Sequence, residues 1–410
     1  MPGRPFRFLH AADLHLDSPF QELGRAAPWL RPVLQDASLR AFERLLDLAV
    51  DESVDLVVWA GDVFDHEAPS LRAQLAVRDG IARLGERGLP VFWAHGNHDP
   101  YNALAVDIDW PGNLTRFPAG RVAHAAVPDR QDPSRTLCEV YGVSYPDARV
   151  PESYVEQFER DDQAPWAMAV LHGNIGGQPG HDNYAPARLA ALTARDFDYW
   201  ALGHVHHRAI LSQEPWVVYP GNLQGRHPRE DGPKGAMVGA VDEEGAVQLA
   251  FHPLAPIAWR TLTLDVTGEA YADRVEERLA EALGDRSAPG GEEGTLVRVE
   301  LTGRSALARL GPDDWLVMAE RLSDRERRPG FVFVESIVSH LSRPLAPDPP
   351  DGLLARALAE VDRLALPSDW KSIWPFPDPL PPRIAREVRQ RAQDRLRDML
   401  GEELPAEEEC

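Results

Sequence analysis

Five short apolar segments in the first half of the chain are each followed, within a few positions, by side chains that can bind a metal ion. A continuous apolar run of this length predicts a strand buried on both faces. The segments are Phe6–Ala12, Leu56–Ala60, Val91–His95, Trp166–Leu171 and Tyr199–Leu202. Apolar residues at helical spacing lie between them, over Leu39–Val50 and Leu71–Leu84. This alternation predicts a layered α/β domain, in which loops at the carboxyl ends of the strands gather the functional residues.

The polar residues that follow these strands form one candidate metal-binding set. Its members are Asp13, His15, Asp62, Asn97, His172, His204 and His206. We expect Asp13 and His15 to bind one ion together, and Asp62, which is central in the order, to bridge two ions. Imidazole and oxygen ligands together suit manganese, iron or zinc better than calcium or magnesium. Two such ions activate water and clamp a phosphoryl group, so the set predicts a two-metal phosphoesterase.

Two further residues are predicted to take part in the chemistry. His98 directly follows Asn97, so it should face the site without binding metal. A cationic imidazole there can stabilise developing negative charge or protonate the leaving oxygen. Asp65, three residues beyond Asp62, is predicted to hold and polarise His98. Asp99 is predicted to close the turn after the strand.

The composition favours a folded protein in a reducing compartment. A length of 410 residues suggests two or three domains, and 43% hydrophobic residues argue against disorder. No apolar run approaches the roughly 20 residues that span a bilayer, and the N-terminus shows no secretory signal. Two cysteines give no disulfide framework. We therefore expect a cytoplasmic protein without a membrane partner.

The charge balance argues against a surface built for nucleic acid. The formal net charge is −22, from 43 basic and 65 acidic residues, whereas phosphate contacts need cations. Net charge describes the whole surface, however, and two bound divalent ions would make the cleft itself positive. All basic residues except Lys234 and Lys371 are arginine. Arginine is the better bidentate phosphate partner, although codon bias explains the same excess.

The pattern divides the chain into three parts. Residues 1–255 carry the predicted two-metal phosphoesterase domain, and residues 256–342 read as a small α+β domain. Residues 343–410 combine a Pro-rich linker with a helical tail, in which Arg383–Leu400 carries six arginines beside an apolar face. That helix could bind a partner groove or fold back on its own domain, and the two alternatives stay open.

The motifs resemble those of a known family. The sequences DLH, GDVFD, GNHD, LHGN and GHVHH are similar to the calcineurin-like metallophosphoesterases, within them to the SbcD-type DNA repair exonucleases, and most closely to the bacterial YhaO group. Residues 219–230 also resemble that group, and residues 256–342 resemble its capping domain in order and size. The resemblance implies a four-layer β-sandwich flanked by helices, two manganese ions on the seven candidate ligands, and a transition-state role for His98. Archaeal and eukaryotic relatives carry histidine where this chain has Asp65.

The function hypothesis is a manganese-dependent DNA phosphodiesterase. A metal-bridging hydroxide would attack the phosphorus, a His98/Asp65 dyad would assist, and nucleotides would leave from a 3′ end, with endonuclease action left open. Four residues near the cleft in sequence are predicted to grip the DNA backbone: Arg208, Arg226, His227 and Arg229. The resemblance also implies an SMC-like ATPase partner, and a homodimer is left open. The alternatives are a metallophosphatase or phosphodiesterase acting on a small molecule or phosphoprotein, and a non-catalytic scaffold.

Overall fold

The computed structural model describes residues 4–21, 23, 27–65, 69–102, 108–177, 183–284 and 291–344. The helical tail predicted from the sequence lies outside the described residues. The chain divides into two compact units. The first contains residues 1–262, 283–298 and 322–336, and the second contains residues 263–282, 299–321 and 337–410.

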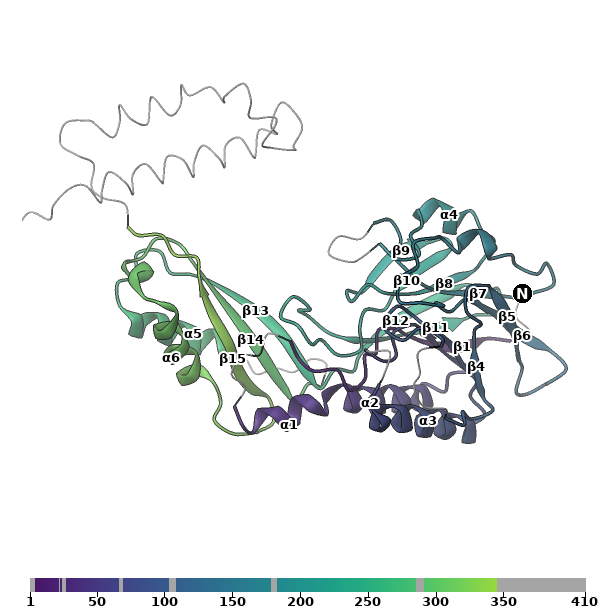
Figure 1. The fold of residues 1–410 in the computed structure, drawn as a ribbon, viewed down its shortest axis with the longest axis horizontal. Helices are drawn as coiled ribbons and strands as arrows, with labels where there is room; N and C mark the ends of the chain where they lie inside the picture. The colour runs from purple at the N-terminus through teal and green to yellow at the C-terminus, as the bar shows by residue number, and fades with distance from the viewer. Residues whose placement is uncertain are drawn as a thin grey trace, which may run out of the picture. The chain divides into compact units, whose positions relative to one another are not determined.

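The first unit contains two six-stranded sheets (Figure 1). The first sheet has the order β12-β11-β1-β2-β3-β4. Its strands are β1 Phe6–Ala11, β2 Leu56–Ala60, β3 Val91–Ala94, β4 Leu114–Arg116, β11 Gly235–Val241 and β12 Val247–Pro253. Strands β1 to β4 run parallel, while β11 is antiparallel to both of its neighbours. The carboxyl ends of β1, β2 and β3 therefore lie at one edge.

The second sheet also has four adjacent parallel strands, with the order β5-β6-β7-β8-β10-β9. Its strands are β5 Ala123–Pro128, β6 Thr136–Gly142, β7 Ala167–His172, β8 Tyr199–Gly203, β9 Ala209–Gln213 and β10 Trp216–Tyr219. The four inner strands are parallel, and the edge strands β5 and β9 are antiparallel to them. The ends of β7 and β8 thus point the same way.

The two sheets pack face to face through a core of apolar side chains. Phe8 and Val58 of the first sheet belong to the same buried cluster as Val140 and Val170 of the second. Every residue of β2, β7 and β8 is buried, as expected for the continuous apolar runs that predicted them. Full burial of an aliphatic or aromatic side chain contributes about 2 kcal/mol, so this layer contributes much of the stability of the domain.

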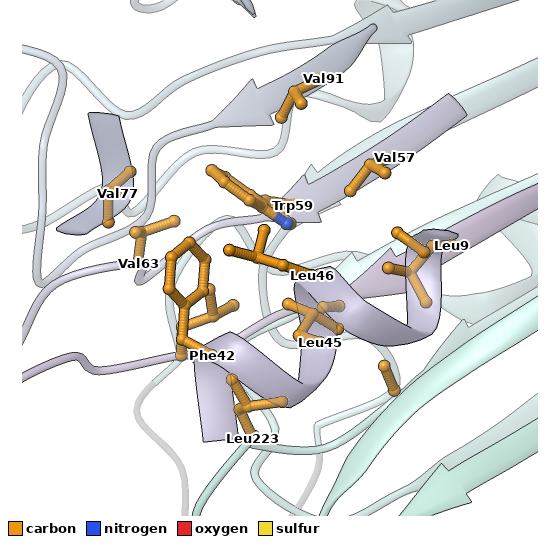
Figure 2. Packing of buried hydrophobic residues seen from close by; sticks show 14 of the residues in the cluster. Leu9, Phe42, Leu45, Leu46, Val57, Trp59, Val63, Val77, Val91 and Leu223 are labelled. Carbon is orange, nitrogen blue, oxygen red and sulfur yellow. The ribbon is translucent and has the colours of Figure 1, made fainter. Parts of the chain in front are cut away.

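Two helices cover the outer face of the first sheet. Helices α2 (Ala37–Asp51) and α3 (Leu71–Glu86) follow β1 and β2 in the chain and pack against that face. The short helix α1 (Leu30–Gln35) packs instead with Ile257 and Phe331. Figure 2 shows Phe42, Leu45 and Leu46 of α2 packed near Trp59 of β2. The side chain of Ser70 accepts a hydrogen bond from Ala73 N at 3.1 Å and caps the start of α3.

The outer face of the second sheet carries less helix than the first. Its apolar side chains, including Tyr141 and Trp200, pack with the short helix α4 (Leu189–Thr193), the 3₁₀ turn η1 (Val155–Gln157) and connecting loops. The layers are therefore helix, sheet, sheet and a thin mixed layer. The predicted α/β class and metallophosphoesterase sandwich are confirmed.

A three-stranded sheet follows the sandwich in the chain, with the order β13-β14-β15. Its strands are β13 Ile257–Asp265, β14 Gly294–Thr302 and β15 Phe331–Ser339; the helical segments are α5 Ala272–Leu283, η2 Ala306–Arg309 and α6 Pro312–Leu322. These elements match those expected for the α+β segment. Within the described part of the chain, no helix is long and apolar enough to cross a membrane.

Candidate metal centre

The candidate ligands lie just beyond the strand ends that meet at one edge of the sandwich. Asp13 and His15 follow β1, Asp62 follows β2, and Asn97 follows β3. His172 ends β7, while His204 and His206 follow β8 directly. Asp13 joins the two sheets, because its carboxylate oxygens accept the His204 N–H at 3.1 Å. The structure therefore brings together all seven residues that the sequence singled out.

Four of these ligands adopt a left-handed backbone that is uncommon outside glycine. The φ angles are 51° at Asp13, 43° at His15, 51° at Asp62 and 100° at His204. Two of these residues are held by main-chain bonds, from Asp13 N to Gly61 O and from His15 N to Asp62 O, both 3.0 Å. Each such residue costs about 1–3 kcal/mol and persists only where its surroundings over-determine it. The loops are therefore built to aim these side chains.

Glycine is required where the loops from the two sheets touch. A Cβ atom on Gly203 would lie 1.8 Å from the carbonyl oxygen of Ala60, and one on Gly61 would lie 2.2 Å from Nδ1 of His172. Gly61 also has φ +93°, which side chains rarely adopt. The glycines in the motifs thus permit the close approach that the ligand set needs.

Asp13, His15 and His206 form the first group of ligands. The Nε2 atoms of His15 and His206 face each other at 3.2 Å. Nδ1 of His15 lies 2.9 Å from a carboxylate oxygen of Asp65, and Nδ1 of His206 lies 2.5 Å from Oε1 of Glu230. The carboxylates place the ring protons on Nδ1, so both facing Nε2 atoms carry lone pairs. Two lone pairs at this distance repel each other, so the pair needs a cation or a proton between them.

Asp62, Asn97, His172 and His204 form the second group. Oδ1 of Asn97 lies 3.0 Å from Nε2 of His172 and 3.2 Å from Nδ1 of His204. Nδ1 of His172 faces the Ala60 carbonyl oxygen at 2.9 Å, so its proton belongs there. Asp62 Oδ2 lies 3.4 Å from His172 Nε2 and 3.9 Å from His15 Nε2. Asp62 therefore reaches both groups, as expected for a bridging carboxylate.

The pKa values of these side chains follow from the close packing of histidines and carboxylates. Burial lowers the pKa of His172, but the carboxylates of Asp62 and Asp13 outweigh it and raise the pKa to about 9. Burial raises the pKa of Asp62, but His172 and the neighbouring histidines bring it well below its usual range. Burial, together with Arg226, lowers the pKa of His15 to about 3. His172 is therefore protonated at neutral pH, and its positive charge offsets part of the negative charge of Asp62 and Asp13.

The predicted His98/Asp65 dyad needs correction. His98 Nδ1 lies 2.9 Å from the main-chain carbonyl oxygen of Asp65, while the Asp65 carboxylate is 3.6 Å away. That carboxylate lies within hydrogen-bond distance of His15, Ser18 (2.7 Å) and Arg226 (2.8 Å) instead. The Asp65 carboxylate points away from His98 because these three buried groups bind it inside the loop after β2. The side chain of His98 itself is 43% exposed, and its ring centroid lies 5.0 Å from that of His15.

The predicted substrate contacts separate into two kinds. Arg226 is only 5% exposed, and its guanidinium is bound to Asp65 and Ser18, so its prediction as a DNA contact is wrong. His227 is partly buried, and its ring accepts the N–H of Arg229 at 2.9 Å. Arg208 and Arg229 are exposed, and Arg208 stacks over the Phe251 ring at 4.2 Å. Their role toward substrate stays a prediction.

Two residues matter more than the sequence indicated. Glu230 binds His206. The two residues are far apart in the chain, so no local sequence spacing predicts this contact. Asp99 is fully buried, and its carboxylate accepts N–H bonds from Val63 at 2.9 Å and Gly96 at 2.8 Å. Asp99 therefore closes the turn as expected, and it also ties the loop after β3 to the loop after β2. Burial, with Asp62 nearby, raises its pKa to about 8.

Two family models match the chain. Residues 6–208 match the calcineurin-like phosphoesterase family, and residues 259–342 match the middle domain of the metallophosphoesterase YhaO. An uncharacterized metallophosphoesterase YhaO of Bacillus subtilis is 36% identical over 264 residues, which cover 63% of this chain and 63% of that protein.

More distant relatives are named as nucleases or repair proteins. A DNA double-strand break repair protein Mre11 of Methanosarcina mazei is 26% identical over 278 residues, 65% of this chain and 41% of its own length. A protein of Staphylococcus epidermidis, named as a subunit of the nuclease SbcCD, is 24% identical over 298 residues, 67% of this chain and 75% of its own. A solved dimetal phosphatase from Danio rerio aligns with 61% of this chain and 99% of its own at 13% identity and a TM-score of 0.36. On the two family matches, the chain carries a calcineurin-like metallophosphoesterase domain followed by a YhaO-type middle domain.

Proposed function

We propose that this protein is a two-metal phosphodiesterase that cleaves DNA, with Asp13, His15, Asp62, Asn97, His172, His204 and His206 as its metal ligands. The observation that carries the metal proposal is that the unprotonated ring nitrogens of two histidines face each other. Nε2 atoms of His15 and His206 face each other at 3.2 Å, while both Nδ1 atoms are turned to carboxylates. Only a cation or a proton relieves that arrangement, and the nitrogen and oxygen donors suit manganese, iron or zinc. Manganese is the ion that we propose.

The two ions, when bound, supply an activated water and neutralise charge on the phosphoryl group. The protein's own residues then have distinct tasks. Asp62 would hold both ions, and the His98 N–H donates to its Oδ1 at 2.9 Å. Because the Asp65 carbonyl oxygen holds Nδ1 of His98, Nε2 is left for the substrate. A protonated His98 can therefore donate to the leaving or non-bridging oxygen.

DNA is proposed as the substrate on the strength of the relatives' names and the cleft chemistry. Those relatives are named as a double-strand break repair protein and as part of a nuclease. The exposed arginines Arg208 and Arg229 lie on segments that follow the last ligands and are proposed to contact phosphates. Release of nucleotides from a 3′ end belongs to the same proposal.

The partner and location are further proposals. One relative is named as a subunit of the nuclease SbcCD, which supports a partner protein, and we propose an SMC-like ATPase. A cytoplasmic location is supported by the two cysteines of the whole chain, which give no disulfide framework. Residues 1–255, 256–342 and 343–410 are the proposed domains, the last including the proposed partner-binding tail.

A small-molecule or phosphoprotein phosphoesterase is the second candidate. The observation that favours it is the formal net charge of −22, which opposes DNA at long range. Both candidates use the same ligands, so only the substrate separates them.

End-labelled single- and double-stranded DNA, incubated with manganese, tests the proposal. We expect shortening from 3′ ends that is lost in Asp62→Ala. Hydrolysis of bis(p-nitrophenyl) phosphate is followed in parallel. If the small diester is cleaved and DNA stays intact with and without the partner ATPase, the DNA proposal fails and the small-molecule candidate takes its place. If neither is cleaved and no metal binds, the metal centre itself is wrong.

A further inference from the structure

The two carboxylates that hold His15 and His206 meet at one buried arginine. Nη1 of Arg226 donates to Oδ1 of Asp65 at 2.8 Å, and the Arg226 main-chain N–H donates to Oε2 of Glu230 at 2.6 Å. Asp65 and Glu230 in turn face Nδ1 of His15 and His206. A single residue thus connects, through its side chain and its main chain, the supports of both imidazoles.

This group is withdrawn from solvent, so its charges must satisfy one another. The side chains of Asp65 and Glu230 are each 11% exposed and that of Arg226 is 6% exposed. Burial raises the pKa of Glu230, but its bonds to His206 and to Arg226 reduce it below the usual range. Removing one partner from such a network leaves an uncompensated buried charge. Lys234 adds a further support, since its Nζ donates to the His206 carbonyl oxygen at 2.9 Å.

We propose that Arg226 is a positioning residue, whose guanidinium keeps Asp65 on Nδ1 of His15, next to the Glu230–His206 pair that its main-chain N–H supports, and so fixes one of the two ion positions. The inference rests on the proposed metal centre and deepens it. Carboxylates that orient a metal-bound histidine change metal affinity by about 10–100-fold when they are removed. Arg226 acts one step further away, because it touches neither the ions nor the substrate.

The second ion position has a different support. His172 Nδ1 rests on the main-chain carbonyl oxygen of Ala60, which no side-chain substitution removes. Loss of Arg226 should therefore weaken one ion and spare the other. A general loss of stability would weaken both.

Calorimetric titration of manganese into the metal-free full chain tests this, using Arg226→Met and the nearly isosteric Glu230→Gln. In each variant we expect one of the two ions to bind about 10–100-fold more weakly, and the other with unchanged affinity. Electron paramagnetic resonance at two equivalents should then show isolated manganese where the wild type shows a coupled pair. Because both residues act on one position, the double variant should lose much less than the two single losses combined.

Arg4→Met is the matched control. Arg4 also joins two carboxylates, Asp55 at 2.7 Å and Asp129 at 2.9 Å, but it precedes β1 at the opposite, amino-terminal ends of the strands. Arg226→Lys keeps the charge with a different geometry and should fall between Arg226→Met and the wild type.

Unchanged binding of both ions in Arg226→Met, or equal weakening of both ions in either single variant, would overturn the inference. Thermal unfolding identifies a variant that fails to fold; if Arg226→Met is that variant, the conservative Arg226→Lys decides, and unchanged binding there overturns the inference. A wild-type protein that binds no pair of ions would instead defeat the proposed function, so the two failures are distinguishable.

Discussion

The two halves of the metal centre hold their histidines by different means. In the first group His15 and His206 rest on ionised side chains, Asp65 and Glu230, which belong to loops beyond the strand ends. In the second group His172 rests on a main-chain carbonyl group of β2. The fold itself therefore supplies the second support, whereas the first depends on two charged residues that are not themselves ligands. A sequence can keep every ligand and still lose half of this centre.

The largest expected effect comes from Asp62, which serves both halves. In Asp62→Ala the rate of bis(p-nitrophenyl) phosphate hydrolysis should fall by about a thousandfold or more, because charge stabilisation by two ions contributes several kcal/mol. Metal content measured on the same sample should drop for both ions. A variant that kept one ion at full affinity would show that Asp62 belongs to one half only.

Substitution of His98 tests chemistry without touching either half. In His98→Asn the turnover number should fall by about a hundredfold, the lower end for loss of a general acid or an electrostatic donor. Manganese affinity should stay at the wild-type value, as measured by calorimetry. Loss of metal affinity would instead place His98 among the supports of the ions.

The pH dependence of metal binding should follow His172. Its pKa of about 9 means that the metal-free protein holds a proton there, which must leave before the imidazole can bind an ion. Affinity at the second position should rise about tenfold per pH unit up to about pH 9 and then level off. Glu230→Gln, with its first position weakened, isolates this ion. Calorimetry in buffers of different ionisation enthalpy counts the released proton; a flat affinity between pH 7 and 9 would contradict the assignment.

The smallest effect is expected outside both halves, at Arg229. This arginine is exposed, so Arg229→Ala should reduce DNA affinity a few-fold and lower the slope of affinity against salt by about 1. Filter binding across a salt series measures both quantities. Arg78→Ala, which changes a partly exposed arginine of α3 paired with its neighbour Asp79, is the control. Equal slopes in Arg229→Ala and wild type would remove Arg229 from the proposed DNA surface.

The sequence predicted the features that depend on local pattern. Continuous apolar runs predicted β2 and β8, and the ligands were found because the parallel strands end at one edge. The role of Asp65 could not be read this way. Its position three places beyond Asp62 does not fix where its carboxylate points; burial next to Ser18 and Arg226 does. Arg226 was misread for a related reason. An arginine looks like a phosphate contact in sequence, and only its burial shows that it serves the protein's interior.

Strand β1 carries Asp13 and His15 at its end, yet one of its two neighbours in the sheet is β11, which lies at residues 235–241. During synthesis, all seven candidate ligand residues, the last at position 206, are therefore translated before β11, which is needed to complete the first sheet. A nascent chain that ends between residue 206 and β11 contains every ligand residue but lacks the complete sheet that positions them. Truncation at about residue 230 should consequently give a polypeptide with the complete motif set and little ability to capture metal.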